Sequence, residues 1–215
     1  MKKTACLVAL ISLMVLCSLF LINCTKAENS AKNIVSDSSS DTLLKVIVER
    51  KSIRDYTDYE VPDEKINEIL TLAQRAPSAG NLQPYKIYVV KDKSIIKKLA
   101  IASHNQNAVS SAPQLLVFVA LPEVSATRYG DRGKNLYSIQ DTTIIAAYTQ
   151  LVLECYDLKS VWIGAFNPKD VSEILKLNDS REKPLVILPF GQSERISQGY
   201  TLRKSLKDIV SYLKD

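Results

Sequence analysis

The sequence predicts an α+β fold, a three-layer α/β/α sandwich in which helices cover both faces of one central sheet. Helical and strand-like patterns alternate along residues 42–215, which is typical of helices packed around a sheet. Residues 115–121 (LLVFVAL) form an unbroken apolar run, the pattern of a strand buried on both faces. With 215 residues, 46% hydrophobic and 24% charged, the chain is long enough for one such domain and an appendage.

The first half of the domain predicts two helices, a strand and a third helix. Apolar residues at helical spacing follow Asp41, and a second such set follows Pro62 and stops before Pro77. Residues 86–90 (KIYVV) then predict a strand, and residues 94–102 a short helix. The second half predicts strands at 115–121, 160–164 and 185–189 and helices at 137–158, after Asn167-Pro168 and at 202–213.

Composition and motifs exclude several classes of function. The net charge of +5 is mild and spread along the chain, so we expect no nucleic-acid interface. A single histidine, His104, excludes an HExxH metal site, and the six glycines form neither a GxGxxG fingerprint nor a GxxxxGK[ST] loop. Cys155 is the only cysteine after residue 24. The domain therefore has no internal disulfide or four-cysteine zinc site, and we expect Cys155 to be buried on a helix.

The first 41 residues are expected to target and tether the chain rather than to fold with the domain. Residues 1–3 give a basic start, and residues 5–24 (ACLVALISLMVLCSLFLINC) carry no charge. A membrane-spanning helix needs about 20 apolar residues, whereas a signal-peptide core has about 7–15. Residues 25–41 are polar and rich in serine, which predicts a linker. The chain is thus divided into a signal or anchor segment (1–24), a linker (25–41) and a folded domain (42–215).

Three interpretations of residues 1–24 are open. They are a cleaved secretory signal, a retained signal anchor, or a lipoprotein signal in which Cys24 becomes the lipidated first residue. The third rests on Leu21-Ile22-Asn23-Cys24, which resembles a bacterial lipobox except that Asn23 stands where Gly, Ala or Ser is usual. All three place the domain outside the cytoplasm, and the last two attach it to a membrane. A domain on the cytoplasmic face is the alternative.

Residues 49–56 (ERKSIRDY) form a compact group of hydrogen-bond donors at the expected end of the first helix. Arg50, Lys51 and Arg54 supply three cations, and Ser52 supplies a hydroxyl. The forked donors of arginine match the geometry of a phosphate. The segment therefore predicts an anion site, with a solvated basic helix end as the alternative.

Residues 75–85 (RAPSAGNLQPY) predict a loop that suits a flat ligand. Pro77 and Pro84 restrict the backbone, and the small residues between them let it approach a ring closely. Asn81 and Gln83 present amide groups that match the polar edge of a heteroaromatic ring. Taken alone, this segment is also compatible with an ordinary turn between a helix and a strand.

Together these two segments resemble the nitroreductase family of FMN-dependent oxidoreductases, which carries an R-[RH]-S-x-R segment and a P-S-x-x-N-x-Q-P-W loop. Tyr85 stands where Trp is usual. Residues 158–166 (LKSVWIGAF) resemble the family's G-L-G-x-x-W-I-G stretch without its two early glycines. Residues 184–191 (PLVILPFG) match its last core strand, and Arg203-Lys204 match its C-terminal basic pair. The resemblance extends over about residues 43–215 and implies the same three-layer fold.

The resemblance also implies an FMN site at the interface of a homodimer, with no catalytic side chain and no metal. The implied ligands of the FMN phosphate and ribityl chain are Arg50, Lys51, Ser52, Arg54, Arg203 and Lys204. One side of the flavin would be lined by Pro77, Ser78, Ala79 and Asn81, and the other side by Trp162, Ile163 and Gly164. Asp141 would be a polar neighbour of the flavin. Residues 129–133 (YGDRG) lie where substrate-capping segments of the family occur, and a plain surface turn is the alternative.

The implied activity is the transfer of hydride from NAD(P)H through flavin N5 to a small electron-poor acceptor, of nitroaromatic or quinone type. Two alternatives are a reductive dehalogenase-type flavoenzyme of the same family and a membrane-tethered flavin- or ligand-binding module without turnover. NAD(P)H is a cytoplasmic pool, so a domain outside the cytoplasm would need a membrane quinol or a redox protein as its electron donor.

Overall fold

The computed structural model describes residues 40–178, 180–194 and 203–213, so the predicted signal or anchor segment and most of the linker lie outside the described residues. The helices are α2 (Ser40–Glu49), α3 (Asp63–Ala73), α4 (Lys93–Ala102), α5 (Asn107–Ser110), α6 (Pro122–Arg132), α7 (Ser138–Cys155) and α8 (Pro168–Leu175). The strands are β1 (Tyr85–Val90), β2 (Gln114–Ala120), β3 (Lys159–Ser160) and β4 (Lys183–Gly191). Within these ranges, no helix has the length and apolar character that a membrane span requires.

The four strands form one antiparallel sheet in the order β1-β2-β4-β3. β2 lies inside the sheet between β1 and β4, and all seven of its residues are buried. The prediction of a strand buried on both faces is therefore confirmed. In register, Leu116 of β2 faces Leu188 of β4, and Val117 faces Ile187.

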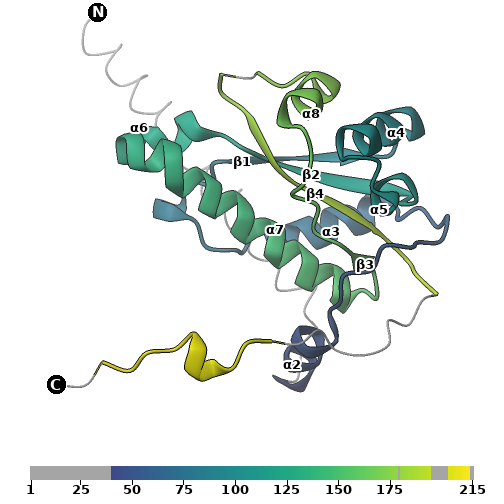
Figure 1. Cartoon of the computed structure of the whole chain (residues 1–215), viewed down its shortest axis with the longest axis horizontal. Coiled ribbons are helices and arrows are strands. Elements are labelled where there is room, and N and C mark those ends of the chain that lie inside the picture. Colours follow the sequence, from purple (N-terminus) through teal and green to yellow (C-terminus); the bar gives the residue numbers. More distant parts are fainter. Residues whose placement is uncertain (1–39, 179, 195–202, 214–215) are drawn as a thin grey trace, which may run out of the picture.

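Helices cover both faces of this sheet, as predicted (Figure 1). Side chains alternate along β2, so Leu115 and Val117 join a core with α4, α5 and α8. Leu116 and Phe118 point the other way and join a second core with α3 and α7. The α+β class and the three-layer arrangement follow from these two cores.

Side-chain N-caps begin two of the helices, and the cap of α8 was predicted from the sequence. The Asn167 side chain accepts hydrogen bonds from the backbone N–H groups of Lys169 and Asp170, at 3.0 and 3.4 Å, and Pro168 occupies the first turn of α8. Asp92 accepts in the same way from Ser94 N and Ile95 N at the start of α4.

Several predictions are corrected in the second half of the chain. Residues 160–164 do not form a continuous strand, because β3 ends at Ser160 and only an isolated bridge between Ile163 and Ile187 follows. Val161 faces Pro189, which has no N–H to donate to the ladder. Residues 203–213 form no long helix, only the 3-10 turn Leu206–Asp208. Their apolar side chains face solvent, and a short amphipathic helix needs a packing surface to be stable.

The third correction concerns the segment around the long helix. α7 is shorter than the predicted 137–158, and it follows helix α6 and the π-helical turn η2 (Gly133–Tyr137), which the sequence patterns did not predict. Residues 129–133 are therefore not a plain loop but the junction of α6 and η2. Cys155 is the last residue of α7 and is exposed, contrary to the expectation that it is buried.

Candidate functional site

The basic segment, residues 50–54, is fixed to the sheet beside β3. Ser52 and Ser160 form a parallel bridge, and Ile53 N donates to Ser160 O at 3.1 Å. Ser160 is also held by α7, because Gln150 Nε2 donates to its hydroxyl at 3.3 Å. The segment is thus attached to both the sheet and the long helix.

The cations of this segment lie at the surface. Ile53 is buried, so alternation of the extended chain directs its neighbours Ser52 and Arg54 toward solvent, and both are exposed. Arg54 Nη1 donates to Ser52 O at 3.2 Å. Arg50 and Lys51 are half-buried. A fixed backbone with guanidinium and hydroxyl groups on its outer side suits a phosphate.

The segment 162–164 follows Ser160 directly and adds an aromatic surface. Ile163 is buried and exchanges backbone hydrogen bonds with Ile187 at 2.9 and 3.0 Å. Trp162 before it is 37% exposed, and Gly164 after it is exposed. The structure therefore brings the basic segment and residues 162–164 into the same region, because the bridge at Ser160 holds the basic segment two residues before the exposed Trp162.

The loop before β1 has an unusual backbone. Gly80, Asn81 and Gln83 have φ values of 56°, 58° and 49°, in the left-handed region where non-glycine residues are strained. Local hydrogen bonds hold this shape: Gln83 N donates to Ser78 Oγ at 3.2 Å, and Gln83 Nε2 donates to Asn81 O at 3.1 Å. Pro77 and Asn81 are exposed, and Ser78 and Ala79 are half-buried. The loop presents small side chains and an amide to solvent.

Asp141 attaches this loop to α7. Its Oδ1 accepts a hydrogen bond from Ala79 N at 3.0 Å, and the residue is only 3% exposed. Burial raises the pKa of the Asp141 carboxyl above its usual range, although the Ala79 hydrogen bond opposes this. Burial, with the nearby charge of Asp141, also raises the pKa of Tyr85. Among the described residues, neither Asp141 Oδ2 nor the Tyr85 hydroxyl has a hydrogen-bond partner.

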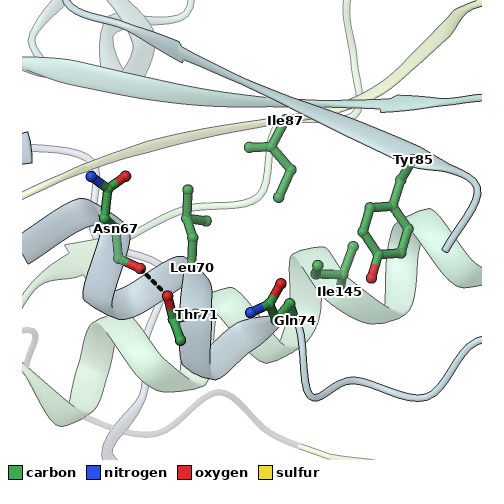
Figure 2. Close-up of a pocket in the computed structure, with 7 residues that line it drawn as sticks. All are labelled: Asn67, Leu70, Thr71, Gln74, Tyr85, Ile87 and Ile145. Carbon is green, nitrogen blue, oxygen red and sulfur yellow. Dashed lines mark hydrogen bonds between the residues drawn. The ribbon is translucent and has the colours of Figure 1, made fainter. Parts of the chain in front are cut away.

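A shallow pocket of about 460 Å³ lies behind this loop, between α3, β1 and α7. Figure 2 shows Tyr85 and Ile87 extending from β1 toward α3 and α7. The polar side-chain groups of the pocket are the amides of Asn67 and Gln74 and the hydroxyls of Tyr85 and Thr71. The Thr71 hydroxyl donates to Asn67 O at 2.7 Å. With no charged side chain in its lining, this pocket offers no counterpart to a phosphate.

The predicted site residues form two groups that are separated within one chain. The loop is attached to α7 at Asp141, and the basic segment is attached through Gln150, nine residues further along. At 1.5 Å per residue, these two anchors are about 13 Å apart. Arg203 and Lys204 lie on the exposed C-terminal segment, which leads away from the domain in Figure 1.

The structure adds residues that the sequence did not single out. Arg128 and Tyr129, at the end of α6, contact Gly80 of the loop. The family resemblance offered residues 129–133 only as a candidate substrate-capping segment, because nothing local indicates that α6 lies against a loop almost fifty residues earlier. In the described part of the chain, no group of three His, Cys, Asp or Glu side chains could hold a metal ion.

Comparisons with known proteins agree with this architecture. The model of the nitroreductase family matches residues 47–192. The NADH dehydrogenase of Thermus thermophilus is 32% identical over 167 residues, covering 65% of this chain and 82% of its own. The FMN reductase [NAD(P)H] of Bacillus subtilis is 28% identical over 148 residues, covering 63% and 59%. A nitroreductase family protein of Clostridium difficile 630 has a solved structure with a TM-score of 0.69 and 32% identity, covering 79% of this chain and 96% of that one. On this evidence, the chain belongs to the nitroreductase family of oxidoreductases.

Proposed function

We propose that this enzyme uses FMN to transfer hydride from a reduced nicotinamide nucleotide to a small electron-poor acceptor, of nitroaromatic or quinone type. The observation that carries the proposal is the basic segment held at Ser160, two residues before the exposed Trp162, because its cations suit a phosphate and the indole suits a flat ring. The names of its relatives, an NADH dehydrogenase and an FMN reductase that uses NAD(P)H, support the same donor and cofactor.

The residues of both groups fit FMN chemically. Arg50, Lys51 and Arg54 match a phosphate dianion, and the Ser52 hydroxyl matches a phosphate or ribityl oxygen. The small residues of the loop let a planar ring approach the backbone, and the exposed Asn81 amide offers a donor and an acceptor to its polar edge. When bound, FMN supplies a ring that accepts and returns a hydride equivalent. The protein's part is to bind, orient and shield that ring.

We further propose that two chains complete each site as a homodimer. The loop and the basic segment are attached to α7 about 13 Å apart, and the proposal is that a partner chain covers each site. Apolar side chains that would suit such an interface are exposed on α2 and on the C-terminal segment: Leu43, Leu44, Ile47, Val48, Leu206, Ile209, Tyr212 and Leu213. Arg203 and Lys204, on that same C-terminal segment, would then approach the phosphate from the partner.

Flavin retention tests the cofactor assignment. The purified protein should be yellow and release FMN on denaturation, because the binding is non-covalent. The double variant Arg50→Ala and Arg54→Ala should lose most of its flavin, while the double variant Lys97→Ala and Lys98→Ala, which removes two exposed cations on α4, should retain it. Equal flavin content in both variants contradicts the phosphate assignment.

Turnover distinguishes an enzyme from a flavin-holding module. NADH or NADPH should bleach the flavin absorbance, and a nitroaromatic or quinone should restore it. A panel that also includes a halophenol identifies the acceptor class. A yellow protein that no donor bleaches, including a quinol, would support a binding module instead.

A further inference from the structure

Two arginines and two tyrosines form a cluster at the junction of α6 and η2. The guanidinium carbon of Arg128 lies 5.5 Å from the centre of the Tyr129 ring, and that of Arg132 lies 5.4 Å from the centre of the Tyr137 ring. The two rings meet edge to face, with centroids 5.1 Å apart. Arg132 Nε also donates to the Tyr137 hydroxyl at 2.9 Å. Each guanidinium group thus lies over a tyrosine ring, where a cation–π interaction favours this placement.

Within the described residues, neither guanidinium has a carboxylate within 4.0 Å. Both arginine side chains are exposed. Of the two acids in the same stretch, Glu123 is paired with Lys134 at 2.6 Å, and Asp131 is exposed and forms no salt bridge with a described residue. The cluster therefore offers two cations whose charge no carboxylate of the described residues neutralises by direct contact.

The cluster contacts the loop that the proposed function assigns to the flavin. A Cβ atom placed on Gly80 would lie 2.6 Å from the Tyr129 hydroxyl and 2.7 Å from Arg128 Nη1. These two atoms therefore occupy the space directly over residue 80. The base of the cluster is closely packed, because a Cβ atom on Gly133 would collide with the Ser125 carbonyl. The backbone that carries the two arginines is thus held next to the loop.

We propose that Arg128 and Arg132 form an anion subsite at the edge of the flavin site, which takes the carboxylate or phosphate of a ligand reacting there. This inference rests on the proposed function and narrows its substrates to anionic ones. A carboxylate on the acceptor and a phosphate of the nicotinamide nucleotide share the chemistry that two arginine forks recognise. Such a group would hold the reactive part of the ligand over residues 79–81.

Titration calorimetry on the full-length protein in detergent tests the subsite without requiring turnover. The probes are 4-nitrobenzoate with its neutral counterpart 4-nitrobenzamide, and NADP⁺ with NAD⁺. The variant Arg128→Gln with Arg132→Gln removes both charges, and Lys97→Gln with Lys98→Gln is the matched control on α4. The variant Arg128→Lys with Arg132→Lys keeps the charges and guards against misfolding of the glutamine variant, which circular dichroism detects.

We expect the glutamine variant to bind at least one anionic probe tenfold or more weakly, which corresponds to about 1.4 kcal/mol. Binding of 4-nitrobenzamide should stay unchanged, and the lysine variant should bind with intermediate affinity. If only the binding of 4-nitrobenzoate is weakened, the subsite recognises a carboxylate of the acceptor. If only the binding of NADP⁺ is weakened, it recognises the 2′-phosphate, and if the binding of both nucleotides is weakened, it recognises their diphosphate.

The proposal is overturned if the parent binds no anionic probe more tightly than the glutamine variant does. It is also overturned if the substitutions weaken the binding of 4-nitrobenzamide as much as that of the anionic probes. The flavin content of the parent, measured by absorbance before each titration, reports separately on the proposed function. A colourless protein that still discriminates anions at this cluster would refute the cofactor and keep the subsite.

Discussion

At the scale of single residues, Asp141 links the fold to the site. Its carboxylate fixes the backbone of Ala79 from α7, and burial raises the pKa of this carboxyl. The sequence predicted Asp141 as a polar neighbour of the flavin. The structure attaches it to the loop that would line the flavin, and contact with the cofactor itself stays a prediction.

Substitution of Asp141 should change how the stability of the protein depends on pH. The folded protein holds the Asp141 proton to a higher pH than the unfolded chain, where the pKa is about 3.9. The contribution of Asp141 to stability is therefore largest below about pH 4 and is lost as the pH rises through the raised pKa. Asp141→Asn cannot ionise and keeps an oxygen for Ala79 N–H, so its stability relative to the parent should improve between pH 4 and pH 7.

Urea unfolding of the parent and Asp141→Asn at several pH values measures this difference. Asp141→Ala is the comparison, because it leaves the Ala79 N–H without its partner and should be destabilised by about 1–3 kcal/mol. A stability difference between parent and Asp141→Asn that does not vary with pH would show that the carboxyl titrates normally.

Gly80 is a second residue whose identity the structure explains. Its φ of 56° favours glycine, and a side chain there would displace the ends of Arg128 and Tyr129. We expect Gly80→Ala to lose about 1 kcal/mol from the left-handed backbone, because the displaced groups are the flexible ends of side chains and can move. Urea unfolding measures the stability, and a loss above about 3 kcal/mol would indicate a rigid contact instead.

At the scale of secondary structure, helix α8 depends on its N-cap. Asn167→Ala removes the acceptor for Lys169 N and Asp170 N and should destabilise the protein by about 1 kcal/mol. Asn167→Asp keeps a capping oxygen and should be near the parent. The backbone hydrogen bond from residue 167 N to Ala102 O does not depend on the side chain, so it does not contribute to the difference in stability between the two variants. Chemical denaturation compares them, and equal stabilities would show that the cap contributes nothing.

At the scale of the whole molecule, the exposed apolar C-terminal segment predicts association. Leu206 is 73% exposed and Leu213 99%, and such side chains gain free energy when a partner covers them. We expect sedimentation equilibrium to give the mass of two chains at micromolar concentration. Leu206→Ser with Leu213→Ser should weaken the dimer and release flavin, whereas Ile101→Ser, at a 60% exposed position on α4, should not. A flavin-loaded monomer at that concentration contradicts the model of shared sites.

The location of the domain is a separate prediction. We propose that residues 1–24 tether the domain to the outer face of the membrane, because a basic start precedes the uncharged segment. Protease added to intact cells should then cleave the domain, and a membrane quinol or redox protein should reduce it faster than NADPH. Protection until lysis, together with rapid NADPH oxidation by the purified protein, would place the domain inside.

The layers of the fold and the segments of the candidate site could be predicted from the sequence alone. The unbroken apolar run 115–121 predicts a strand covered on both sides, and the helical spacing after Pro62 predicts α3. Local signals such as Asn167-Pro168 fixed where α8 begins. The basic segment and the loop were identified because the types, order and spacing of their residues resemble the motifs of the nitroreductase family.

How these segments meet could not be predicted from local patterns. The pattern at 202–213 is helical, but residues 203–213 have no surface in one chain to bury it, and the strand expected at 160–164 is interrupted where Val161 faces Pro189. Likewise, α6 lies against Gly80, and Asp141 and Gln150 separate the two halves of the site along α7. Local propensity depends on neighbouring residues, whereas these outcomes depend on contacts between residues far apart in the chain.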